Sequence, residues 1–186
     1  MDCNCKDLES SHTNFECKCG VYRQRFPDCQ CESESVSDNS PGIVQDEEWL
    51  VRSLYNANVL EDGCVTTAYI RGLIGDKGLS VDRLDHSSDI QLRTRELQHP
   101  LPQNQVLFVA AQCSKVRDLN IDQKRLFCIY DTASRERPEH AEICQNVDKP
   151  TGEGSKKLMM KIAEQLAEVF SEANETPSAC IEDFGD

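Results

Sequence analysis

Six cysteines near the amino terminus form three Cys-x-Cys pairs: Cys3 and Cys5, Cys17 and Cys19, and Cys29 and Cys31. In an extended chain, residues i and i+2 point to the same side, so each pair offers two sulfur atoms to one ligand. Zinc takes four thiolates in structural sites, and three converging pairs supply six. The sequence therefore predicts a Zn²⁺ site with these six cysteines as metal ligands.

The stretch that carries these pairs has few apolar side chains, the main ones being Phe15, Val21, Tyr22 and Phe26. So short a segment has little apolar surface to bury, whereas metal binding supplies ~10–16 kcal/mol. Three alternatives remain open for the same cysteines. They are a flexible tail of reduced thiols, disulfides formed after export, and an iron–sulfur cluster.

The whole chain of 186 residues is acidic, with a net charge of −13 and no basic segment. Nucleic-acid binding depends largely on Lys and Arg that neutralise phosphates, so a nucleic-acid partner is not expected, and a protein partner is. The first residues have neither a basic stretch nor an apolar one, which predicts that there is no signal peptide. No apolar run approaches the ~20 residues that span a bilayer. We therefore expect a cytoplasmic protein with no membrane contact, in which thiols stay reduced.

Changes in composition divide the chain into four parts. The Cys-rich residues 1–31 form the expected zinc module, and residues 32–45, rich in Ser, acids, Pro and Gly, have linker composition. Residues 46–174 are predicted to form a globular domain, followed by an acidic tail at 175–186. The expected fold class is α+β: a small mixed domain of few strands and several helices, preceded by the metal-stabilised module.

Hydrophobic periodicity and capping residues predict the elements of the globular domain. Helices are expected at 46–58, at 65–78, at 87–100, from Pro138 onward and at 155–174. Strands are expected at 78–83, 105–112 and 124–132.

Some residues of the globular domain have side chains that could do enzymatic chemistry. A local Arg/His pocket that contacts phosphates would be built from Arg52, His86, Arg93, Arg95, His99, Arg135 and Arg137. The alternative is an exposed, salt-bridged face, which helical spacing in 89–96 favours. Cys113 follows a predicted strand and is the best candidate for a thiol nucleophile. The His140-x-Glu142 pattern matches half of a zinc deaminase motif, but the Pro-Cys-x-x-Cys half is missing.

These patterns favour a zinc-binding protein-interaction protein with an adaptor or regulatory role. The long helix at 155–174 is a plausible contact element. Two alternatives remain: a toxin-like enzyme that acts on nucleotides or RNA through the Arg/His pocket, and an acidic inhibitor of a basic partner.

Overall fold

The computed structural model describes residues 5–6, 18–54, 60–61, 64–75, 77–87, 107–148 and 151–172. Its helices are α2 (Lys18–Arg25), α3 (Thr67–Leu73), α5 (Cys113–Arg117) and α6 (Ser155–Glu172), with 3₁₀ turns η1 (Gln30–Ser33) and η3 (Leu84–His86). The strands are β1 (Trp49–Leu54), β2 (Leu60–Glu61), β3 (Cys64–Val65), β4 (Leu79–Arg83), β5 (Leu107–Gln112), β6 (Asn120–Ile121), β7 (Lys124–Arg125), β8 (Phe127–Asp131) and β9 (His140–Gln145).

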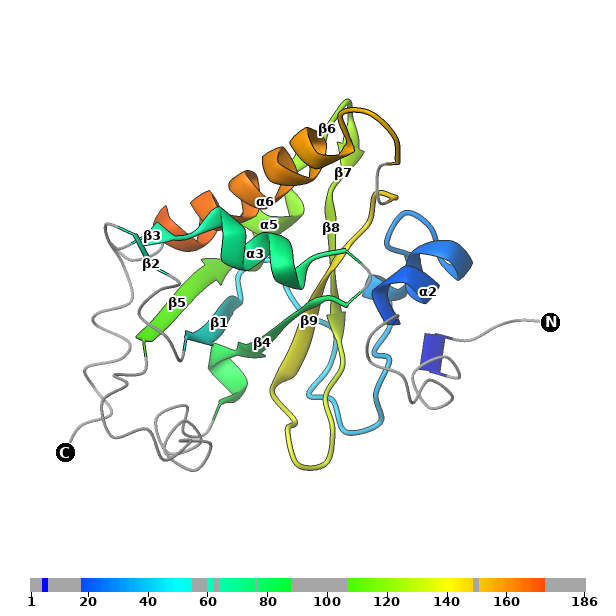
Figure 1. Cartoon of the computed structure of the whole chain (residues 1–186). Coiled ribbons are helices and arrows are strands. Elements are labelled where there is room, and N and C mark those ends of the chain that lie inside the picture. Colours follow the sequence, from blue (N-terminus) through cyan, green and yellow to red (C-terminus); the bar gives the residue numbers. More distant parts are fainter. Residues whose placement is uncertain are drawn as a thin grey trace.

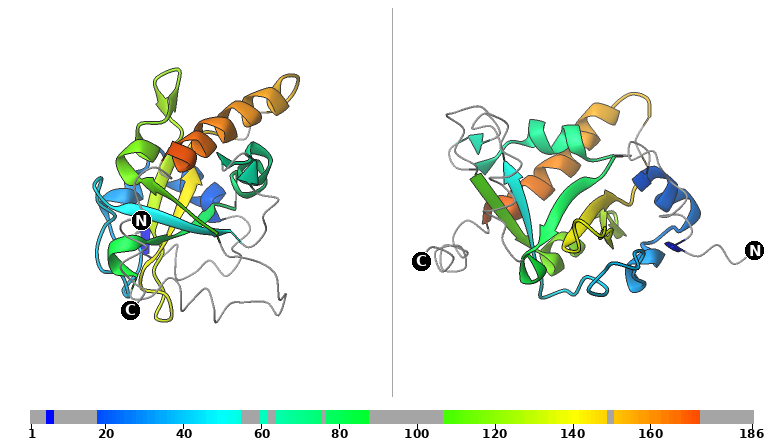
Figure 2. Two further views of the ribbon diagram at one scale, coloured as in Figure 1. Left: turned by 90° about the vertical axis from the view of Figure 1, so that its left-hand side faces the viewer. Right: turned by 90° about the horizontal axis from the view of Figure 1, so that it is seen from below.

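Five strands form one antiparallel sheet in the order β5-β1-β4-β9-β8. Helices α3 and α6 cover one side of this sheet, and α2 lies on the other side beside β9 (Figure 1). In the view from below, α6 and the blue amino-terminal segment lie on opposite sides of β8 and β9 (Figure 2). Helices and a mostly antiparallel sheet confirm the predicted α+β class.

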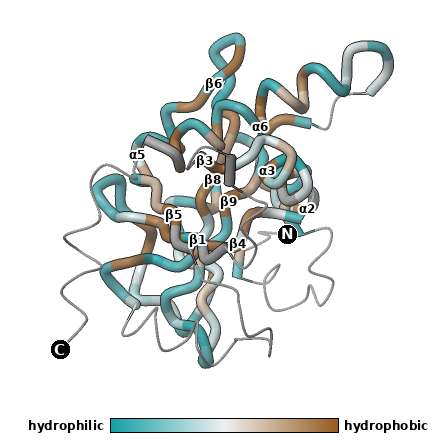
Figure 3. The backbone as a smooth tube through the Cα atoms, turned by 60° about the vertical axis from the view of Figure 1, so that its left-hand side comes forward, coloured by the Kyte–Doolittle hydropathy of each residue, from teal (hydrophilic) through white to brown (hydrophobic). Residues whose placement is uncertain are grey.

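Alternating side chains give the two faces of the sheet different cores. The face toward α6, here called the helix face, carries Leu50, Leu79, Val81, Ile129 and Ile143, with many other aliphatic residues. The opposite face, here called the cysteine face, carries Cys128, Tyr130 and Cys144. Hydrophobic residues gather along β8, β9 and the inner side of α6, whereas many loop residues are hydrophilic (Figure 3).

The amino-terminal segment 18–45 contributes side chains to the core of the cysteine face. Tyr22 is fully buried and stacks on Tyr130, with ring centroids 4.5 Å apart. Phe26 and Val36 are buried in the same cluster. The described part of the predicted module and linker therefore shares a core with β8 and β9.

Two predicted helices are wrong. Residues expected to start a helix at Asp46 form strand β1, and the helix expected from Pro138 is strand β9. Each strand lies between two neighbours, so its backbone groups are satisfied by the sheet, and this tertiary pairing overrides local helix preference. In β9 every residue from Ala141 to Gln145 is buried, including the polar Glu142 and Gln145. Polarity in the sequence therefore does not mark a solvent-exposed face of this strand.

The other elements agree with expectation where they are described. Helices α3 and α6 and strands β4, β5, β7 and β8 lie within the predicted ranges. The helix expected at 87–100 lies outside the described residues, apart from its first position. Among the helices that are described, none is long and apolar enough to cross a membrane.

Candidate metal site on the cysteine face

Strands β8 and β9 place two cysteines side by side. Cys128 and Cys144 are direct cross-strand partners and both belong to the cysteine-face core. Direct partners in an antiparallel pair have Cβ atoms about 4.5–5.5 Å apart. Their register therefore fixes two sulfur atoms on one patch of the sheet.

The amino-terminal segment brings a sulfur atom to each of these two positions. Cys19, in α2, is bonded to Cys144, and Cys29, just before η1, is bonded to Cys128. A third bridge joins Cys5 to Cys31. The Cα–Cα distances of the three bridges are 5.3, 5.3 and 5.8 Å, within the usual range for disulfides.

Local backbone conformation directs Cys29 toward the sheet. Asp28 and Cys29 both adopt left-handed conformations, with φ of 56° and 59°, and the chain then enters η1. Because this stretch is not extended, Cys29 and Cys31 have different partners instead of forming one pincer. The cysteine spacing alone does not determine where each sulfur points; this turn does.

A carboxylate accompanies each of the two sheet-anchored cysteine pairs. Cys19, Glu142 and Cys144 form what we call the first sulfur group, and Cys29, Glu32 and Cys128 form the second. In each group the sulfur and carboxylate oxygen atoms all lie within 4.8 Å of one another. If the disulfide in each group were reduced, two thiolates and one carboxylate oxygen would form a donor set that could hold a metal ion.

Basic side chains lie next to both carboxylates. The Lys18 Nζ atom, on an almost fully buried side chain, is 3.9 Å from Glu142 Oε2. Glu32 accepts a hydrogen bond of 2.6 Å from Arg125 and also accepts the backbone N–H of Ile129. Both sulfur groups are therefore anchored in a partly neutralised, polar environment.

Gly78, just before β4, leaves room for the first sulfur group. Its φ is +86°, and a Cβ atom added there would lie 2.6 Å from Cys19 Sγ and 3.5 Å from Cys144 Sγ. Any other residue would collide with the sulfur atoms and adopt a strained backbone. The site therefore depends on a glycine that the sequence analysis did not single out.

All six paired cysteines are buried, with at most 6% of each residue exposed. A closed site of this kind fits a structural role, because catalytic metal sites keep a position open to substrate. Of the six predicted ligands, Cys5, Cys19, Cys29 and Cys31 take part in this cluster, and Cys3 and Cys17 lie outside the described residues.

Four residues of the two sulfur groups were missed as ligands: Glu32, Cys128, Glu142 and Cys144. Cys144 lies in the segment predicted to be a helix from Pro138 onward, and Cys128 lies within the strand predicted at 124–132. With β9 recognised as a strand, the spacing of Glu142 and Cys144 would have placed both on one face. The pairing of β8 with β9, which joins distant parts of the chain, has no local sequence pattern.

Cys113 does not have the properties of a nucleophile. Its side chain is fully buried at the start of α5, and burial raises the pKa of the thiol to about 12. Reactive cysteines instead have lowered pKa values that populate the thiolate. The candidate catalytic role of Cys113 is therefore not supported.

The described members of the predicted Arg/His pocket are not gathered in one place. Arg52 donates to Tyr69 and to the Ser80 carbonyl, whereas Arg137 pairs with Asp82 and His86 lies near Glu48. Arg93, Arg95 and His99 lie outside the described residues. The pocket remains a prediction that rests on these undescribed positions.

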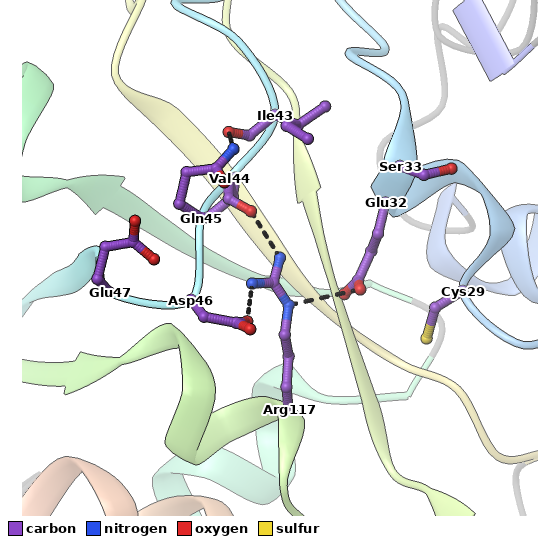
Figure 4. Close-up of a pocket in the computed structure, with 9 residues that line it drawn as sticks. All are labelled: Cys29, Glu32, Ser33, Ile43, Val44, Gln45, Asp46, Glu47 and Arg117. Atoms are coloured by element: carbon purple, nitrogen blue, oxygen red, sulfur yellow. Dashed lines mark hydrogen bonds and ion pairs between the residues drawn. The ribbon is translucent and has the colours of Figure 1, made fainter.

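An open pocket of about 420 Å³ lies beside the second sulfur group (Figure 4). Arg117 projects into it and is held by Asp46 at 2.5 Å, by the Val44 carbonyl at 2.8 Å and by Glu32 at 3.5 Å. Because these acceptors surround the guanidinium, it serves to fasten the amino-terminal segment to α5.

Comparison with protein-family models, curated proteins and solved structures finds no match for this chain. The functional argument therefore rests on the geometry of the described residues.

Proposed function

We propose that the protein is a zinc-binding regulatory protein that presents its amino-terminal segment to a protein partner. In the proposed form the thiols are reduced and Zn²⁺ occupies the two sulfur groups. The observation that carries this proposal is that each of the two cysteine pairs anchored to the sheet lies with a carboxylate, all donor atoms of a group being within 4.8 Å of one another. A disulfide that only cross-linked two segments would not require a carboxylate beside it.

The charges of the two sulfur groups fit a divalent cation. Two thiolates and one carboxylate carry three negative charges, so a bound Zn²⁺ leaves one, or two when a further thiolate fills the fourth position. Lys18 beside the first group and Arg125 beside the second supply a compensating positive charge. A buried charge is tolerated when it is paired in this way.

Each group supplies three ligands, whereas zinc prefers four. The remaining predicted ligands, Cys3, Cys5, Cys17 and Cys31, are the candidates for the fourth position. Cys31 lies two residues from Cys29, and Cys17 two residues from Cys19.

A zinc form of this kind belongs in a reducing compartment, which is consistent with the expected cytoplasmic location. The bound metal would keep residues 18–45 folded on β8 and β9, where they form a defined surface for a protein partner. Affinity for that partner would then depend on metal, because loss of metal would release the segment.

A second candidate function is that of a disulfide-stapled binding protein of an oxidising compartment. It is favoured by the three cysteine pairs, whose Cα–Cα distances match ordinary disulfides. In that case the same segment is held permanently, and metal has no role.

Metal content per chain separates the two candidates. The full chain is purified under inert gas without reductant or chelator, and zinc is measured by elemental analysis while free thiols are counted by alkylation and mass spectrometry. We expect bound zinc, which the double variant Cys19→Ala/Cys144→Ala lowers. Glu142→Gln should weaken retention against a chelator by roughly 10-fold or more. The matched control Cys113→Ala, which removes a buried thiol outside both groups, should retain full metal content.

Absence of zinc together with six alkylation-resistant cysteines would support the disulfide candidate and overturn the zinc proposal. Partner binding is tested by cross-linking in host-cell extract with the metal-loaded chain. Adducts that persist equally in Cys19→Ala/Cys144→Ala would contradict a role for the anchored segment.

A further inference from the structure

A second cluster of reactive side chains lies on the cysteine face, next to the first sulfur group, because Ser80 is the cross-strand partner of Glu142. Ser80 in β4, His140 at the start of β9 and Thr132 just after β8 form a chain of hydrogen bonds. Ser80 Oγ is 2.5 Å from His140 Nε2, and His140 Nδ1 is 2.7 Å from Thr132 Oγ1. A hydroxyl, an imidazole and a third group that orients the imidazole are the parts of an activated nucleophile.

The sheet holds these three residues in place. In the register of β4 with β9, Ser80 pairs with Glu142 and Asp82 pairs with His140, so Ser80 and His140 are diagonal neighbours. The backbone N–H of Thr132 donates to the His140 carbonyl at 3.3 Å. Because backbone hydrogen bonds set the spacing, the side chains are ordered without help from a ligand.

The hydrogen bonds also determine where the imidazole proton lies. His140 Nδ1 is 3.3 Å from the Thr132 carbonyl oxygen, which can only accept a hydrogen bond. Nδ1 therefore carries the proton in the neutral ring, and Nε2 presents its lone pair to the Ser80 hydroxyl. This is the tautomer in which histidine acts as general base toward serine.

Access and charge at this cluster suit an acyl substrate. Ser80 and His140 are partly exposed, whereas Thr132 is buried. Asp82, the cross-strand partner of His140, holds Arg137 at 2.5 Å. This guanidinium adds positive charge to the strand that carries Ser80, partly offset by the Asp82 carboxylate that holds it.

From this geometry we infer that Ser80 is a nucleophile toward activated esters, with His140 as its general base and Thr132 as a positioning residue. Ser80 Oγ bonds to the acyl carbon as its proton moves to His140 Nε2, and the carbonyl electrons form an oxyanion. When the oxyanion collapses, the bond to the leaving group breaks and the leaving group takes the proton from His140. Water, deprotonated by His140, then hydrolyses the acyl-Ser80 ester to a carboxylic acid and free serine.

The orienting group limits the substrate class. Thr132 offers neutral oxygens where serine hydrolases commonly have a carboxylate, so the imidazolium formed during attack is stabilised less. Esters with good leaving groups, such as phenyl esters, therefore fit better than amides. This activity does not involve the sulfur groups and is independent of the proposed zinc role.

The test uses the full chain with its cysteines untouched and a fluorophosphonate as probe. Ser80 Oγ displaces fluoride from phosphorus, the proton passes to His140, and the adduct is located by peptide mass spectrometry. We expect one adduct at Ser80, none in Ser80→Ala, and labelling at least roughly 100-fold slower in His140→Gln. Ser33→Ala is the matched control, because Ser33 is exposed and bonded only to a backbone carbonyl among the described contacts. That control should label at the unchanged rate.

Thr132 is examined with a conservative pair of variants, which also covers the case that His140→Gln fails to fold. Thr132→Val should slow labelling by roughly 3- to 10-fold, and Thr132→Ser should restore it. Only serine keeps the side-chain oxygen that bonds His140 Nδ1, whereas both variants keep the backbone carbonyl. No adduct at Ser80, an adduct that forms as fast in His140→Gln, or equal rates in the two Thr132 variants would each overturn the inference.

Discussion

The two faces of the five-stranded sheet are covered in different ways. On the helix face, α3 and α6 bury a continuous aliphatic layer that includes Leu166 and Phe170. On the cysteine face, the covering segment has one short helix and few large apolar side chains, and six sulfur atoms join it to itself and to the strands.

This difference shows how a polar segment can be held on a sheet. Apolar area stabilises the helix face at about 25 cal/mol per Å² buried, without regard to redox state or metal. The cysteine face relies on bonds whose strength depends on the chemical environment. Stability of the two faces should therefore respond differently to reductant, pH and substitution.

The largest effect is expected from removing both bridges between the amino-terminal segment and the sheet. The variant Cys19→Ala/Cys144→Ala/Cys29→Ala/Cys128→Ala opens connections across 125 and 99 residues and should lower the free energy of unfolding of the oxidised chain by at least about 5 kcal/mol. Urea denaturation without reductant measures this. The control Cys5→Ala/Cys31→Ala opens a connection across 26 residues and should cost about 3 kcal/mol. Equal losses in the two variants would show that the bridges do not act through chain entropy.

On the helix face, Phe170→Ala should cost about 4 kcal/mol, because Phe170 is fully buried in the aliphatic core. Urea denaturation with and without reductant distinguishes the stability contributed by the helix face from that contributed by the cysteine face. The loss from Phe170→Ala should persist in reductant. The loss from removing the two bridges to the sheet, Cys19–Cys144 and Cys29–Cys128, should disappear, because reductant breaks them in the parent as well. If both losses disappear, the two faces do not have separate sources of stability.

The end of the amino-terminal segment that leads into β1 is held by an ion pair between Arg83 and Glu48. Arg83 is buried and donates to both carboxylate oxygens of Glu48, at 2.7 Å each, and to the carbonyls of Gly42 and Ile43. Burial alone would raise the pKa of Glu48, but hydrogen bonds from Arg83 and from the Gln45 backbone hold it below its ordinary value of 4.5. Glu48→Gln leaves the buried arginine with Asp131, 3.8 Å away, as its remaining acidic partner and should cost about 3 kcal/mol at pH 7.

The sign of the pH dependence follows from that lowered pKa. The ion pair contributes its full stability above pH 4.5 and loses it as the pH falls through the lower value that Glu48 has in the folded state. Urea midpoints between pH 7 and pH 3 should fall less steeply in Glu48→Gln than in the parent. Glu164→Gln, which alters an exposed carboxylate of α6, is the control and should keep the parental slope.

The smallest effect concerns Gly78. Gly78→Ala should cost about 2–3 kcal/mol, since it combines a positive φ with a contact of 2.6 Å to Cys19 Sγ. Gly75→Ala is a matched control with φ of +107° and no atom within 4 Å of the new Cβ, and should cost about 1 kcal/mol. In a Cys19→Ala background the difference between these two variants should vanish, as measured by urea denaturation.

The sequence was informative where local pattern decides structure. The apolar stripe of residues 155–174 predicted α6, and the β-branched run at 105–112 predicted β5. It failed at β1 and β9, which are held by neighbours on both sides and bury polar residues such as Glu142. For such strands the deciding interactions are with distant residues.

The candidate site was predicted in the same partial way. Cysteine spacing identified a sulfur-rich segment and four described members of the cluster. It gave no indication of Cys128, Cys144 or the two carboxylates, because these reach the segment only through the pairing of β8 with β9. The hydrogen-bonded set of Ser80, Thr132 and His140 has no local sequence pattern either, because strand pairing brings these distant residues together.

The position of Glu32 has a consequence for self-association. β8 is the last strand of the described sheet, and Glu32 occupies the backbone N–H of Ile129 on its outer side. Release of the segment would uncover a hydrophobic strand edge that can pair with other chains. Conditions that break the sulfur linkages should therefore produce oligomers before they produce unfolded monomer.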